Sequence, residues 1–125
     1  MRNSNLAVSA AAGVAALFLA AATYAQAPNG KWDGIYPGVS WTQIAGGGSC
    51  DANHGPPHQL EIRNGHIDET WGTLKVTGDI GADGKGEART SFGGHLWITV
   101  DAQGAQANYM GGQTCGYKLV WGKRT

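Results

Sequence analysis

Two histidines bracket two prolines in the segment His54-Gly-Pro-Pro-His58. Imidazole nitrogens are common ligands of zinc and copper, so His54 and His58 are candidate metal ligands, and His66 or His95 is available to complete the shell. The spacing argues against such a site, because a His-x-x-x-His pair shares one face only on a helix and consecutive prolines do not permit a helix. We therefore favour histidines of a solvent-exposed loop, and we predict no bound metal and no cofactor.

Hydrolytic chemistry needs a nucleophile with a base, or two carboxylates that face each other. The serines at positions 40, 49 and 91 do not occur in a Gly-x-Ser-x-Gly elbow. Asp68 and Glu69 are adjacent on a predicted strand, so their side chains point to opposite faces and do not form a catalytic pair. We therefore predict that the protein is not an enzyme. Glu69 is the more unusual of the two, because the alternation turns it inward as a candidate polar group in a pocket.

The five tryptophans raise the question of an apolar or glycan ligand. Trp32, Trp71 and Trp121 fall on predicted inward faces, where packing in the core is the default role of a large aromatic side chain. Trp97 alternates with Leu96 and Ile98 and is predicted to face outward. Trp41 and Trp97 would form a binding patch if they were adjacent on the surface.

Cys50 and Cys115 are the two cysteines of the chain. In an exported protein the default for such a pair is a disulfide, and closing a loop of this size stabilises a small domain by about 4 kcal/mol. The alternative is two buried thiols, or one thiol that is reactive near His54. We predict the disulfide, which ties the loop 45–57 to the final strand.

The N-terminus has the pattern of a secretory signal peptide. A short polar segment with one positive charge, Arg2, precedes an apolar, alanine-rich run over residues 6–22, and Thr23-Tyr24-Ala25 places small residues where a signal peptidase reads them. We predict a signal-peptide helix in residues 1–25, cleaved after Ala25, and a flexible leader over residues 26–31. The predicted location is therefore outside the cytoplasm, in the periplasm or secreted; an uncleaved membrane anchor is the alternative.

Without residues 1–25 the chain has 100 residues, the size of one small domain. Removing Arg2 from the nine Lys and Arg leaves eight against nine Asp and Glu, a net charge of −1. A nearly neutral domain without a basic cluster gives no electrostatic reason to expect nucleic acid, or a membrane after signal cleavage, as a partner. We expect a monomer.

The rest of the chain alternates between short apolar-patterned strands and glycine-rich turns. The final segment is typical: Cys115, Tyr117, Leu119 and Trp121 point one way and their neighbours mostly the other. Turns recur every 8 to 12 residues, which is typical of an all-β sandwich or barrel. We predict one antiparallel up-and-down β-barrel or sandwich of seven or eight strands over residues 32–125.

Three local signals refine this prediction. Pro37 lacks an N–H donor and is expected to interrupt the first strand. Asn64-Gly65 predicts a tight hairpin that brings Ile67 opposite Ile62, with Glu61 facing Asp68 on the outer side. Ala88, Thr90 and Phe92 are expected to share one face of a later strand.

The opening Trp32-x-Gly-x-Tyr36-x-Gly38, the Asn64-Gly65 and Asp83-Gly84 turns and the Cys115-Gly-Tyr-x-Leu ending resemble small exported bacterial β-barrel domains, with the strand rhythm of lipocalin- and avidin-like barrels. Members of such groups bind small apolar ligands or block proteases. The resemblance implies a barrel, but it transfers neither activity to particular residues.

Two function classes remain open. The first is a non-enzymatic binding module of the bacterial envelope, which takes a small apolar or glycan ligand or engages a protein through the loop 45–57. The candidate surface comprises Trp41, Trp97, Glu69, His54 and His58. The second is a structural or stress-protective envelope protein whose barrel has no ligand cavity.

Overall fold

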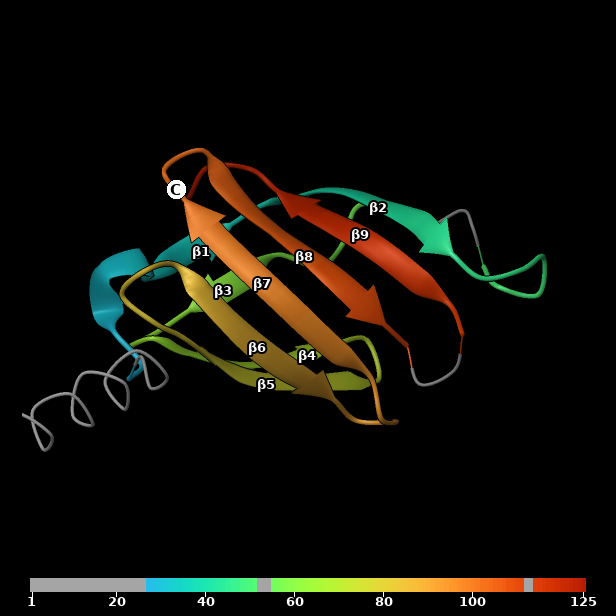
Figure 1. The fold of residues 1–125 in the computed structure, drawn as a ribbon. Helices are drawn as coiled ribbons and strands as arrows, with labels where there is room; N and C mark the ends of the chain where they lie inside the picture. The colour runs from blue at the N-terminus through green and yellow to red at the C-terminus, as the bar shows by residue number, and fades with distance from the viewer. Residues whose placement is uncertain (1–26, 52–54, 112–113) are drawn as a thin grey trace, which may run out of the picture.

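The computed structural model describes residues 27–51, 55–111 and 114–125. Within them the chain is almost entirely β-sheet, curled into a half-barrel that a second, smaller sheet accompanies (Figure 1). The elements are a 3-10 turn η1 (Gly30–Trp32) and the strands β1 (Gly34–Tyr36), β2 (Gly38–Ala45), β3 (Leu60–Ile62), β4 (His66–Trp71), β5 (Leu74–Ile80), β6 (Lys85–Thr90), β7 (His95–Asp101), β8 (Gly104–Met110) and β9 (Gly116–Trp121). The all-β prediction is confirmed. The predicted signal peptide lies outside the described residues.

The large sheet has seven antiparallel strands in the order β2-β9-β8-β7-β6-β5-β4. From β4 to β9 each strand pairs with the next one in the sequence, as an up-and-down meander requires. The exception is β2, which pairs with the last strand, β9, and so joins the start of the domain to its end. Among the described residues, no helix has the length and apolar character needed to cross a membrane.

β2 and β4 are the edge strands of the large sheet, and each has a ladder partner on one side only. The small sheet lies beside these two edges. As expected, Pro37 interrupts the first strand and separates β1 from β2. β1 pairs with β3, with Ile35 opposite Glu61, and a bridge between Arg63 and His66 links β3 to β4. The small sheet therefore spans the opening between the two ends of the large sheet.

The hairpin between β3 and β4 has the predicted Asn64-Gly65 turn, with φ angles of 54° and 75°. The Asp33 carboxylate accepts hydrogen bonds from both turn N–H groups, at 2.7 Å and 2.9 Å. A side chain at Gly65 would collide with the backbone of Asn29. This close contact belongs to the segment predicted as a flexible leader: where it is described, Pro28 forms a bridge with Gly81 and the Asn29 N–H donates to the Ile80 carbonyl.

The apolar faces of the strands meet in one continuous core. Leu60, Val76, Ile80, Leu96 and Leu119 have no exposed surface, and Tyr36, Trp71 and Trp121 fill the interior between the sheets. Phe92 does not join Ala88 and Thr90 on the inner face, because β6 ends at Thr90. Phe92 has a φ of 85° in the following turn and is 80% exposed.

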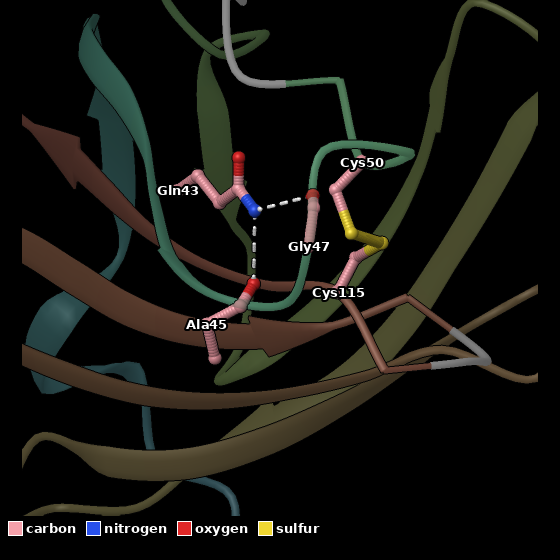
Figure 2. The surroundings of a disulfide bond; sticks show 5 residues. All are labelled: Gln43, Ala45, Gly47, Cys50 and Cys115. Atoms are coloured by element: carbon pink, nitrogen blue, oxygen red, sulfur yellow. Dashed lines mark hydrogen bonds between the residues drawn. A yellow bond between two sulfur atoms is a disulfide. The ribbon is translucent and has the colours of Figure 1, made fainter.

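The predicted disulfide between Cys50 and Cys115 is present (Figure 2), with its Cα atoms 5.7 Å apart. It connects the loop after β2 to the residue before β9. The Gln43 amide holds the same loop by donating to the carbonyls of Ala45 and Gly47 at 3.2 Å and 3.3 Å. β2 and β9 are thus joined by a ladder, and a covalent bond connects the segments next to one end of that ladder.

Replacing both Cys50 and Cys115 by serine should lower the free energy of unfolding by about 2–4 kcal/mol, because the unfolded chain gains the freedom of an open loop. Urea denaturation of the double variant, of the oxidised wild type and of the reduced wild type measures this effect. The reduced wild type should match the double variant. Equal midpoints for all three would show that the disulfide does not contribute to stability.

Candidate functional site

Glu69 points inward from β4, as its position in the alternation predicts, and its side chain is only 7% exposed. One carboxylate oxygen accepts a hydrogen bond from the Glu61 N–H at 3.0 Å. Because β3 and β4 are bridged only at Arg63 and His66, this side chain supplies a bond that a strand ladder would otherwise make. On the outer side, where Glu61 is predicted to face Asp68, Glu61 forms an ion pair with Arg63 at 2.7 Å and Asp68 forms one with Lys75 at 3.3 Å.

The electrostatics of Glu69 follow from its burial. Loss of solvation raises the pKa of this carboxyl above its ordinary value, and the Glu61 N–H and the nearby His58 partly oppose that effect. The His58 Nδ1 atom lies 3.5 Å from the second carboxylate oxygen. Glu69 is therefore a buried acid at the seam between β3 and β4, with one imidazole beside it.

His58 is fixed to the end of the barrel by its neighbours. Its ring stacks on Trp71, with centroids 6.4 Å apart and planes inclined by 21°, and its carbonyl accepts a hydrogen bond from the Trp121 indole at 2.8 Å. The structure thus brings His58 and Glu69 together, while His54 lies outside the described residues. In the part of the chain that is described, no three His, Cys, Asp or Glu side chains are grouped so that they could hold a metal ion.

Trp41 and Trp97 are not adjacent. Trp41 lies opposite Leu119 on the inner face and packs edge-on against Tyr109 and Tyr117, each at 5.9 Å. Trp97 is 47% exposed on the outer face of β7, as the alternation with Leu96 and Ile98 predicts. Because the two tryptophans lie on opposite faces of the sheet, they do not form a common patch.

Trp97 nevertheless has a defined environment. Its ring stacks on His95 of the same strand, with centroids 4.2 Å apart and planes inclined by 29°. The His95 Nε2 atom lies 2.8 Å from a carboxylate oxygen of Glu87, and Glu87 is the residue opposite Trp97 on β6. On the other side, β8 places Asn108 opposite Trp97. Three neighbouring strands therefore position groups around one indole.

A hollow of about 610 Å³ adjoins this indole on the outer face; we name it the Trp97 hollow. Its polar lining residues are Asp79, Asp83, Lys85, Glu87, Thr99 and Asn108. They combine carboxylates, an ammonium group, an amide and a hydroxyl, so that hydrogen-bond donors and acceptors lie beside an apolar ring.

Sequence reasoning identified Trp97 but missed the residues around it. The signal that finds them is the register of the two hairpins that flank β7. The turn between β7 and β8 sets a register in which Trp97 lies opposite Asn108. The turn between β6 and β7 sets a register in which Trp97 lies opposite Glu87. Residues that are 10 and 11 positions away in the sequence thereby become direct neighbours of Trp97 on the sheet.

These observations define a small antiparallel half-barrel domain with a polar hollow beside an exposed tryptophan. Comparison of the chain with protein-family models, with curated proteins and with solved structures finds no match. Its function is therefore inferred from the geometry of the chain itself.

Replacing Glu69 by glutamine keeps an acceptor for the Glu61 N–H and removes the buried charge. Because burial raises the pKa of Glu69, the folded protein holds this proton more tightly than the unfolded chain does. The stability that Glu69 contributes is therefore greatest at low pH and falls as the pH rises through the folded-state pKa. As the pH rises from about 4 towards 7, the wild type should lose free energy of unfolding relative to Glu69→Gln, because only the wild type must ionise a buried carboxyl. Urea denaturation of both proteins at several pH values measures this change.

The matched variant Glu69→Ala lacks the acceptor and should be less stable than Glu69→Gln throughout this range. A difference between wild type and Glu69→Gln that does not change with pH would contradict the raised pKa.

Proposed function

We propose that the protein is an exported, non-enzymatic binding module of the bacterial envelope that binds a saccharide in the Trp97 hollow. The observation that carries the proposal is the half-exposed indole of Trp97, held on a rigid sheet beside groups that donate and accept hydrogen bonds. Binding sites of this kind combine an aromatic contact surface with a few placed polar groups.

The chemistry of a sugar suits this arrangement. One side of a pyranose ring is covered by C–H groups, which pack on the negatively charged face of an indole. The hydroxyl groups at the ring edge need both donors and acceptors. Asp79 and Glu87 accept hydrogen bonds from such hydroxyls, whereas Lys85 and the Asn108 amide donate to them.

The filled interior also favours a site on the outer face. A ligand in the barrel mouth beside Glu69 would need space that Tyr36, Trp71 and Trp121 occupy. Binding of a protein through the loop 45–57 stays a prediction, because residues 52–54 lie outside the described residues. The exported location is supported by the N-terminal pattern and is compatible with the disulfide.

A second candidate function is a structural envelope protein, which the filled interior also supports. The two proposals differ in what they require of the outer face. A structural barrel has no need of a shaped hollow beside an exposed indole, whereas a saccharide-binding module depends on it.

Isothermal titration with chitohexaose, cellohexaose and mannohexaose tests the proposed function. We expect the wild type to bind at least one of them, and Trp97→Ala to weaken that binding at least about tenfold, because truncating a central tryptophan removes the largest contact. Phe92→Ala is the matched control: it truncates a more exposed aromatic side chain outside the hollow and should leave the affinity unchanged.

Absence of binding to all three oligosaccharides would overturn the saccharide proposal and favour the structural one. Equal affinities for wild type and Trp97→Ala would place the saccharide elsewhere on the chain.

Export is tested separately by expressing the full chain in a bacterium and measuring the intact mass of the product. We expect a protein that begins at Gln26, recovered from the periplasm or the medium. A variant with Ala25→Pro at the predicted cleavage site should keep its N-terminal segment. A cytoplasmic wild-type product that retains residues 1–25 would contradict the proposed location.

A further inference from the structure

The indole of Trp97 is held in one orientation by its neighbours. A half-exposed tryptophan on an outer sheet face has several rotamers available, and fixing it on binding has an entropic cost. His95 lies two positions earlier on the same strand and on the same face. Its ring covers one face of the indole at a centroid distance of 4.2 Å.

His95 is in turn held by Glu87. The hydrogen bond between the His95 Nε2 atom and the Glu87 carboxylate measures 2.8 Å, and the His95 side chain is only 18% exposed. Glu87 lies opposite Trp97 on β6, so the His95 ring is held between the Glu87 carboxylate on one side and the indole on the other. The stack on this held imidazole orders the plane of the indole before any ligand arrives.

The uncovered face of the indole looks along β7, away from His95. The next outward pair in that direction is Thr99 on β7 and Lys85 on β6, and both line the Trp97 hollow. A ligand therefore meets a single flat face with polar groups at its far edge. Such a face suits a ring whose substituents all lie near the ring plane, because that ring offers a stackable C–H face on both sides, whereas an axial substituent blocks one of the two.

We propose that His95 is a positioning residue, which reserves one face of Trp97 for a β-1,4-linked pyranose chain with equatorial substituents. The proposal rests on the proposed function and adds the ligand class and the residue that sets the geometry. His95 acts through Trp97 and does not itself contact the sugar.

Three substitutions of His95 separate its stacking from its hydrogen bond. His95→Gln keeps a polar partner for Glu87 and loses the aromatic ring, His95→Phe keeps the ring and loses the hydrogen bond, and His95→Ala loses both. We expect His95→Gln and His95→Ala to weaken binding of chitohexaose or cellohexaose about fivefold, because the indole must then be ordered on binding, and His95→Phe to restore it to within about twofold of wild type.

A spectroscopic readout tests the position of the indole directly. With fluorotryptophan incorporated, the ¹⁹F resonance of Trp97 is assigned by its loss in Trp97→Phe. This resonance should shift in His95→Gln and His95→Ala by more than in His95→Phe, while the other four tryptophan resonances stay in place. Mannohexaose, whose rings each carry an axial hydroxyl, should bind more weakly than cellohexaose to the wild type.

Wild-type affinity in His95→Gln, or failure of His95→Phe to restore binding, would overturn the role of His95 while leaving the saccharide site intact. Equal affinity for mannohexaose and cellohexaose would overturn the ligand class. Failure of the proposed function gives a different result, namely no binding of any of the three oligosaccharides or binding that does not depend on Trp97.

Discussion

The structure depends on the pairing of its first long strand with its last. An antiparallel meander leaves two edges with unpaired N–H and C=O groups, and those edges are a cost that a small domain must limit. Here β2 pairs with β9 in a ladder from Gly38 to Ala45, and the bond between Cys50 and Cys115 fixes one end of that ladder. This contact covers the free edge of β9 and leaves β2 and β4 as the two edges of a curled, open sheet, whose apolar face packs against the small sheet.

The remaining opening is closed by short elements rather than by a full strand. β1 and β3 contribute three residues each, and the Glu69 carboxylate supplies a hydrogen bond where β3 and β4 have separated. Asp33 performs a similar task at the Asn64-Gly65 turn. Two carboxylates thus replace backbone partners at the seam. Glu69 in particular is used in closing the barrel, which accounts for an acidic side chain on an otherwise apolar face.

The curled sheet gives the outer face its chemical character. Side chains on the outer face point away from the core and contact one another along and across the strands. Examples are the stack of Trp97 on His95 and the hydrogen bond of His95 with Glu87. Strands hold their side chains more rigidly than loops do, and rigidity lowers the entropic cost of binding. The Trp97 hollow therefore lies on the part of the molecule best suited to keep a fixed shape.

The alternation, the turns and the cysteine pair are evident in the amino-acid sequence, because these signals are local or depend on composition. The strand meander, the Asn64-Gly65 hairpin, the interruption at Pro37 and the outward position of Trp97 could all be predicted from neighbouring residues. The folded sheet was needed to show that Trp41 faces Tyr109 and Tyr117 and that Glu69 bonds to Glu61. Glu87 and Asn108, in contrast, flank Trp97 through the register of the two hairpins around β7, which their turns set. The contacts of Trp41 and Glu69 depend on which strands pack together and on the curl of the sheet, which local residue patterns do not encode.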